Sequence, residues 1–230
     1  MNKYKHIFFD LDRTLWDFDM NSFDALSDIY SSHNLNKHFE SPDEFIGLYH
    51  KHNDRLWSRY REGKIKKEIL RFKRFDLTLK VKKINDKNLS MKISEDYLEL
   101  SVLNKRVFPN TYEILDYLKP KYSLYILTNG FRETQFKKMN NSRLNDYFDR
   151  VFTSETIGYN KPHPKIFQWA VSSVNAKKDE CIMIGDDQAV DIVGAQKFGM
   201  DGIFFNPNNE KEICSPSYMI KDLIELKEIL

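Results

Sequence analysis

Two aspartates near the start of the chain are the residues best placed to do chemistry. Asp10 and Asp12 follow the apolar run Ile7-Phe8-Phe9. In an extended segment residues i and i+2 point to the same face, so both carboxylates can address one point in space. Carboxylates this close repel each other unless a cation separates them or one is protonated. The pair therefore predicts metal-assisted chemistry, with one acid as nucleophile and the other as proton carrier.

Further polar residues stand directly after other predicted strands, or in a loop that could reach the same edge of a sheet. In open parallel sheets, ligands bind beyond the carboxyl ends of the strands. We therefore expect these side chains to gather around the aspartate pair. They are Thr128, Asn129, Lys161, Asp186, Asp187 and Asp191.

The residue types in this set suit phosphoryl chemistry. Several carboxylates at one rim make a hard oxygen site that suits Mg²⁺. A threonine hydroxyl, such as that of Thr128, and nearby backbone N–H groups can donate to phosphoryl oxygens, and Lys161 can supply a positive charge. Phosphate monoesters hydrolyse very slowly without help, so neutralised charge and enforced in-line attack would supply most of the acceleration.

The elements that must position these residues alternate between strand and helix from about Val107 onward. We expect strands at 123–127, 151–153, 181–184 and 202–205. Helices are expected around 133–139, from Pro164, before Gly199 and near 220–229. Short buried strands alternating with helices predict an α/β fold with a doubly wound, mostly parallel sheet.

Residues 16–103 show helical spacing instead and predict an inserted helical cap, with 1–15 and 104–230 forming a Rossmann-like catalytic core. Ser41-Pro42-Asp43-Glu44 has the pattern of a capping box that opens a helix ending at Gly63. Further helices are expected around 66–80 and 94–103, separated by the polar stretch 85–88.

Composition narrows the possible partners and location. The formal net charge of the 230-residue chain is +2, so we expect no nucleic-acid partner, and the basic segment from Lys64 to Lys83 is interpreted as a solvated helical face. There is no apolar run long enough for a membrane span and no signal peptide pattern. Cys181 and Cys214 have no paired spacing and predict free thiols, hence a cytoplasmic protein. We expect a monomer or weak dimer.

Four pieces of the sequence together resemble the four motifs of the haloacid dehalogenase-like superfamily, in order, spacing and strand context. The helical insertion after the first motif resembles the C1-capped phosphatases of that superfamily. The pieces most similar to its pyrimidine 5′-nucleotidase subgroup are Asp10 to Phe18 with Asn21-Ser22, Thr128 to Phe131, Thr153-Ser154-Glu155 and Lys161-Pro162.

This resemblance implies a role for each matching residue. Asp10 would be the nucleophile that forms an aspartyl-phosphate and would also ligate Mg²⁺. Asp12 would protonate the leaving alkoxide and then activate water, while its backbone carbonyl binds the metal.

The later motifs complete the implied set. Thr128 and the Asn129 backbone N–H would hold the phosphoryl group, and Lys161 would offset negative charge. Asp186 would ligate Mg²⁺ directly. Asp187 and Asp191 would contact the residues that bind the metal, or would bind the metal through water.

The resemblance implies hydrolysis of a small-molecule phosphate monoester, an ordinary or modified pyrimidine nucleoside 5′-monophosphate. A sugar-phosphate phosphatase or phosphomutase with the same rim remains an alternative. A phospho-acceptor signalling module is a more remote alternative. Dehalogenase chemistry is disfavoured because those relatives lack the second aspartate, here Asp12. Arg13 departs from the small residue or histidine of many relatives, and its role is left unassigned.

Overall fold

The computed structural model describes residues 3–230, which form two compact units. The first unit, the α/β unit, contains residues 3–18 and Lys105–Leu230, and the second, the helical unit, contains Asp19–Asn104. Trp16 belongs to the α/β unit because isolated β-bridges join it to Asp12 and to Val107. The expected boundaries, after residues 15 and 103, lie close to these. The assignment of the helical unit as a cap stays a prediction.

The α/β unit is built on one six-stranded sheet whose strand order is β3-β2-β1-β4-β5-β6, and every neighbouring pair is parallel. The strands are β1 (His6–Phe9), β2 (Ser123–Thr128), β3 (Arg150–Thr153), β4 (Cys181–Gly185), β5 (Asp201–Phe205) and β6 (Tyr218–Ile220). Because β1 is central, its carboxyl end lies between those of β2 and β4. The predicted α/β class with a parallel sheet is confirmed.

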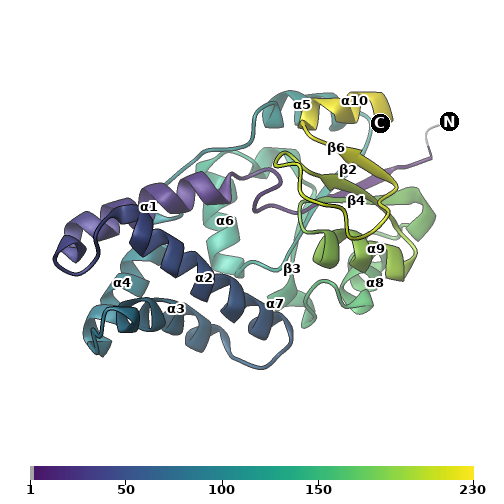
Figure 1. Cartoon of the computed structure of the whole chain (residues 1–230). Helices are drawn as coiled ribbons and strands as arrows, with labels where there is room; N and C mark the ends of the chain where they lie inside the picture. Colours follow the sequence, from purple (N-terminus) through teal and green to yellow (C-terminus); the bar gives the residue numbers. More distant parts are fainter. Residues whose placement is uncertain (1–2) are drawn as a thin grey trace. The chain divides into compact units, whose positions relative to one another are not determined.

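Helices cover both faces of this sheet. Successive β1 side chains point to opposite faces, so Ile7 and Phe9 join one hydrophobic cluster and Phe8 joins another. The first cluster includes residues of α5 and the second includes residues of α8. Figure 1 shows α5 and α10 on one face, with α8 and α9 on the other. The sheet is therefore doubly wound, as the sequence predicted.

The described residues of the α/β unit contain six α-helices, and the positions expected around 133–139, from Pro164 and before Gly199 are all helical. These helices are α5 (Thr111–Leu118), α6 (Arg132–Asn141), α7 (Ser154–Ile157), α8 (Pro164–Ser173), α9 (Val193–Phe198) and α10 (Leu226–Ile229). The helix expected over 220–229 is wrong in its first half, because Ile220 is buried in β6 and pairs with Phe205. A strand of three residues is too short to show an alternating pattern.

The helical unit contains four helices around a core of its own. They are α1 (Phe18–Ser32), α2 (Pro42–Arg61), α3 (Lys67–Val81) and α4 (Lys87–Leu100), of which the first residue of α1 belongs to the α/β unit. This core is largely aromatic: Phe45, Tyr49, Phe75 and Tyr97 are all buried, and Tyr49 lies 5.0 Å from Phe75 between ring centroids.

Two local expectations in the helical unit need correction. Ser41 caps α2, because its hydroxyl accepts from the Glu44 N–H at 3.2 Å. A capping box would also need the Glu44 carboxylate to accept from the Ser41 N–H, but this carboxylate accepts from the Glu40 N–H instead. The polar stretch 85–88 lies only partly between helices, because α3 ends at Val81 and α4 already begins at Lys87. Asp86 caps α4 by accepting from the Leu89 N–H at 2.9 Å, so the helix starts earlier than apolar spacing indicated.

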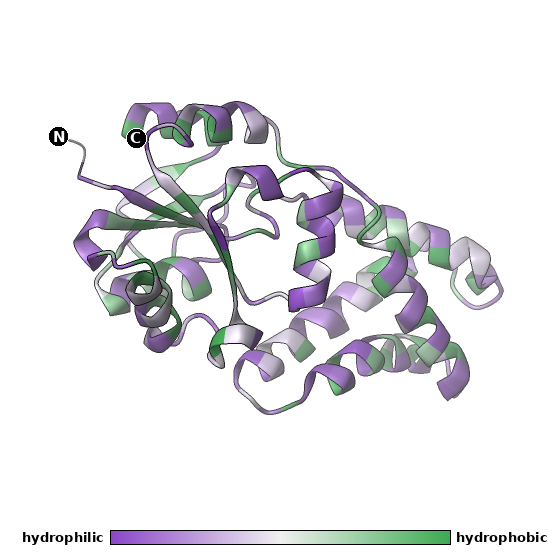
Figure 2. Ribbon diagram, turned by 180° about the vertical axis from the view of Figure 1, so that it is seen from behind, coloured by the Kyte–Doolittle hydropathy of each residue, from purple (hydrophilic) through white to green (hydrophobic). Residues whose placement is uncertain are grey.

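Within the described residues, no helix combines the length and the apolar character that a membrane crossing requires. Figure 2 shows hydrophilic and hydrophobic residues interspersed along the helices of both units, without a long apolar helix. Most of these helices are amphipathic and bury one side against the cores described above.

Candidate active site

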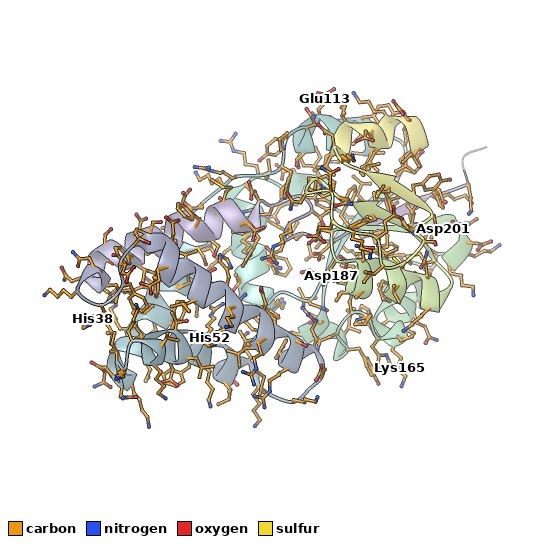
Figure 3. All side chains as sticks on the ribbon, in the orientation of Figure 1. His38, His52, Glu113, Lys165, Asp187 and Asp201 are labelled. Atoms are coloured by element: carbon orange, nitrogen blue, oxygen red, sulfur yellow. The ribbon has the colours of Figure 1, made fainter. Side chains whose placement is uncertain are left out.

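The carboxyl ends of the central strands collect the predicted polar residues at one edge of the sheet. Asp10 directly follows β1, and its N–H donates to the Ile184 carbonyl of β4 at 2.9 Å. Asp186 and Asp187 follow β4, and Asn129 follows β2. In Figure 3, Asp187 lies at this edge, whereas Asp201, the first residue of β5, lies toward the other end of the sheet.

Lys161 lies at the centre of this cluster and is almost completely buried, with a side chain only 1% exposed. Its Nζ lies 2.8 Å from Asp10 Oδ1 and 2.7 Å from Asp191 Oδ1. Burial alone would lower the pKa of Lys161, but the two carboxylates outweigh burial and raise that pKa above its ordinary value. The lysine is therefore a fixed positive charge beside Asp10.

Asn129 holds the backbone of Lys161 in place from β2. Its side-chain Nδ2 donates to the Lys161 carbonyl at 2.9 Å, and its Oδ1 accepts from the Lys161 N–H at 2.8 Å. These two bonds join the loop before α8 to the end of β2. The sequence predicted that Asn129 would act through its backbone. It did not predict the two hydrogen bonds that the Asn129 side chain makes to the Lys161 backbone.

Three carboxylates form a group that could hold a metal ion. One oxygen each from Asp10, Asp186 and Asp191 lies within 4.8 Å of the others. Burial is the main cause that raises the pKa of each carboxyl, to about 7 for Asp191, and repulsion from neighbouring carboxylates adds to it. An oxygen-only site with surplus negative charge fits a hard divalent cation.

Gly185 allows Asp191 to approach the end of β4. A Cβ on Gly185 would lie 2.3 Å from Asp191 Oδ2, so a larger residue would displace this carboxylate. Asp187 caps the turn that carries Asp191 by accepting from the N–H groups of Ala189 and Val190, both at 3.0 Å. Asp191 thus joins the carboxylate group directly, and Asp187 is not among its three members.

Thr14 and Arg13 both act on Asp186. The Thr14 hydroxyl, fully buried, donates to Asp186 Oδ1 at 3.0 Å. The Arg13 charge opposes the rise in the pKa of Asp186, and its guanidinium lies 4.6 Å from the centre of the Phe18 ring. Sequence reasoning missed Thr14, although its position two residues after Asp12 was a usable signal.

The Asp12 carboxylate contacts α6 and is not part of the three-carboxylate group. Lys138 Nζ lies 2.5 Å from Asp12 Oδ1, and Gln135 Nε2 donates to Asp12 Oδ2 at 2.8 Å. Gln135 Nε2 also donates to Thr128 Oγ1 at 2.9 Å. Sequence reasoning missed both α6 residues. The available signal was that residues three apart on a helix following the Thr128 loop share one face.

A family model for haloacid dehalogenase-like hydrolases matches residues 4–199. The chain belongs to this family, and it is a hydrolase with the parallel six-stranded α/β fold of that group. The match includes all four predicted motifs and the whole helical unit.

Individual relatives agree with this assignment. The chain is 28% identical to HAD-hydrolase YfnB of Bacillus subtilis over 100% of this chain and 97% of that protein. The crystal structure of YfnB bound to magnesium has a TM-score of 0.91 at 26% identity, covering 99% of both chains. Pyrimidine 5′-nucleotidase YjjG of Escherichia coli is 27% identical over 99% of this chain and 98% of its own.

A sugar-phosphate enzyme is similar over a shorter region. Glyceraldehyde 3-phosphate phosphatase of Pyrococcus furiosus is 36% identical over 49% of this chain and 49% of that protein. Such relatives share the hydrolase family but not the full length of this chain.

Proposed function

We propose that this protein is a Mg²⁺-dependent phosphomonoesterase that hydrolyses pyrimidine nucleoside 5′-monophosphates through an aspartyl-phosphate. The observation that carries the proposal is the buried Lys161 ammonium, 2.8 Å from Asp10 and 2.7 Å from Asp191, beside three carboxylates that could hold a cation. Such a rim could bind an anion next to a nucleophile, and the ammonium and the cation would balance the charge of that anion.

Asp10 is the proposed nucleophile. Its carboxylate oxygen would attack phosphorus in line with the ester oxygen, so that the new O–P bond forms as the bond to the leaving alkoxide breaks. The Lys161 ammonium would offset the charge that builds on the phosphoryl oxygens. The Thr128 hydroxyl and the Asn129 backbone N–H would bind those oxygens.

Asp12 is the proposed proton carrier, and its carboxylate lies apart from the three-carboxylate group. It would give a proton to the leaving alkoxide, then take one from the water that attacks the phosphorus of the aspartyl-phosphate. That second step releases phosphate and restores Asp10.

The residues proposed to hold Mg²⁺ are Asp10, Asp186 and the backbone carbonyl of Asp12, with Asp191 and Asp187 in support. When bound, the ion would neutralise carboxylate and phosphate charge. The fit rests on the donor set, which consists of oxygen atoms alone, and on the burial that makes three carboxylates beside a single ammonium costly.

The substrate class is supported by the relatives that match this chain along its length. A pyrimidine 5′-nucleotidase aligns with 99% of the chain, including the whole helical unit, whereas a glyceraldehyde 3-phosphate phosphatase aligns with 49%. In this family arrangement the inserted unit would select the leaving group. Hydrolysis of sugar phosphates is the second candidate, supported by that shorter match.

The test is a phosphate-release assay with purified protein, Mg²⁺ and a panel of pyrimidine and purine nucleoside monophosphates and sugar phosphates. We expect the pyrimidine nucleotides to give the highest kcat/KM, and a chelator to abolish turnover. Asp10→Asn is the matched inactive variant. Turnover that survives this substitution, or that ignores the chelator, would overturn the mechanism. A higher kcat/KM for sugar phosphates would overturn only the substrate assignment.

A further inference from the structure

Two side chains on one face of α6, Gln135 and Lys138, contact residues that take part in the proposed reaction. Gln135 is fully buried and Lys138 is 4% exposed, although lysine and glutamine usually lie at the surface. Burying them without partners would cost free energy. Their partners are Asp12 and Thr128, which come from the ends of two different strands.

Gln135 contacts both strand ends through one atom. Its Nε2 donates to Asp12 Oδ2 at 2.8 Å and to Thr128 Oγ1 at 2.9 Å. Gly130 makes room for this amide, because a Cβ there would lie 1.8 Å from Gln135 Nε2. The amide therefore fixes the distance between the carboxylate of Asp12 and the hydroxyl of Thr128.

This arrangement also determines which bond the Thr128 hydroxyl can still make. Thr128 Oγ1 accepts from Gln135 Nε2 and from the Gly130 N–H, at 2.9 and 3.0 Å. A hydroxyl has two acceptor positions and one donor hydrogen. Because both accepted bonds are formed, the O–H hydrogen is directed to a third partner. A phosphoryl oxygen is a suitable acceptor.

Lys138 fixes the other oxygen of Asp12. Its Nζ lies 2.5 Å from Asp12 Oδ1 and 4.0 Å from the centre of the Trp16 ring, which restricts the ammonium to one place. A carboxylate offers about four lone pairs. With one bond to each oxygen, Asp12 is held in orientation while lone pairs remain for a transferable proton.

We propose that Gln135 and Lys138 are positioning residues that hold Asp12 and Thr128 in the geometry for proton transfer to the leaving group. This inference rests on the proposed function. In the step concerned, the Asp10–phosphorus bond forms, the phosphorus–ester oxygen bond breaks, and the proton of Asp12 moves to the departing oxygen. Asp12 is left as a carboxylate that still accepts from both α6 side chains.

The experiment compares kcat/KM for esters whose leaving groups need different amounts of protonation. p-Nitrophenyl phosphate releases a stable phenolate and needs little help, whereas uridine 5′-monophosphate releases an alkoxide that must be protonated. The variants are Lys138→Met, Lys138→Arg, Gln135→Met and the control Lys137→Met. Lys137 is the exposed neighbour of Lys138 on the same helix. Asp12→Asn provides the reference for complete loss of the acid.

We expect Lys138→Met and Gln135→Met to lower kcat/KM for uridine monophosphate by about 100-fold, a loss within the usual range for acid–base catalysis. The value for p-nitrophenyl phosphate should change by less than about 3-fold on the same argument. Lys138→Arg should recover part of the loss, and Lys137→Met should match the wild type.

A purely structural role for the α6 pair would lower both kcat/KM values equally, or lower only the melting temperature, and either result would overturn the inference. If Lys138→Met does not fold, Gln135→Met gives the same leaving-group comparison. Wild-type turnover by Asp10→Asn would instead contradict the proposed function, and this inference with it. With Asp10→Asn inactive, equal losses for the two esters reject the positioning role alone.

Discussion

Each of the two units buries a cation, and the surroundings of the two cations differ. In the α/β unit, Lys161 faces the carboxylates of Asp10 and Asp191. In the helical unit, Arg74 is 4% exposed and donates to neutral groups, the Tyr49 hydroxyl at 3.0 Å and Asn53 Oδ1 at 3.3 Å. Its guanidinium also lies 4.7 Å from the centre of the Tyr97 ring.

The surroundings of these two cations distinguish a reactive site from a polar core. Around Lys161, several ionisable groups crowd together and shift the pKa values of one another, which is the usual state of an active site. Around Arg74, aromatic faces and neutral acceptors surround a single buried charge. We therefore expect substitutions at Lys161 to affect both chemistry and stability, and substitutions at Arg74 to affect stability alone.

The largest expected effect is that of Asp10→Asn. Turnover should fall by at least about 10⁴-fold because the nucleophile is removed. The melting temperature should stay the same or rise, because burial raises the pKa of Asp10 and the charged form is therefore costly in the folded state. Phosphate release and thermal unfolding test both parts. A large loss of stability would show that this carboxylate holds the fold together.

The next effect is that of Lys161→Met, which leaves buried carboxylates without their cation. We expect a loss of about 3–5 kcal/mol in the free energy of unfolding, as for other buried pairs broken from one side. The loss should be smaller at pH 5 than at pH 8, because protonated carboxyls need no cation. Urea titrations at both pH values measure it. Equal losses would mean that Lys161 contributes by packing alone.

Mg²⁺ should stabilise the α/β unit, by about 2.7 kcal/mol at 100 times its dissociation constant. The pKa of Asp191, raised to about 7, predicts that stability without metal falls as pH rises from about 4 to 7, because the folded state binds more protons than the unfolded chain. Added Mg²⁺ should therefore raise the melting temperature more at pH 8 than at pH 5. Calorimetry at both pH values, with and without chelator, checks this; a pH-independent shift would contradict it.

The smallest expected effect is that of Arg74→Met in the helical unit. The Tyr49 hydroxyl and Asn53 Oδ1 would each lose a donor, at a cost of about 1–3 kcal/mol. We expect a lower melting temperature and a change of less than about 3-fold in kcat/KM, since acid–base catalysis involves other residues. A higher KM for nucleotides at unchanged stability would contradict a purely structural role for Arg74 and make it a binding residue.

Much of the site could be predicted from sequence because short apolar runs indicate where the buried strands end. Asp10, Asn129 and Asp186 each lie within two residues of the end of a short apolar run, and parallel strands bring their carboxyl ends to one edge. The same logic failed for β6, whose three residues carry no pattern. It also failed for the start of α4, where the N-cap Asp86 lies in a polar stretch that looked like a linker.

The fold class, the family resemblance and the residue types at the rim could be predicted because they depend on local pattern and spacing. Which carboxylates lie together depends instead on contacts between elements that are far apart in the chain. Asp191 joins Asp10 and Asp186, whereas Asp12 pairs with Gln135 and Lys138. The physical reason is that the partner of a buried charge is set by the packing of a helix against the sheet, and contacts so distant along the chain leave no periodic signal.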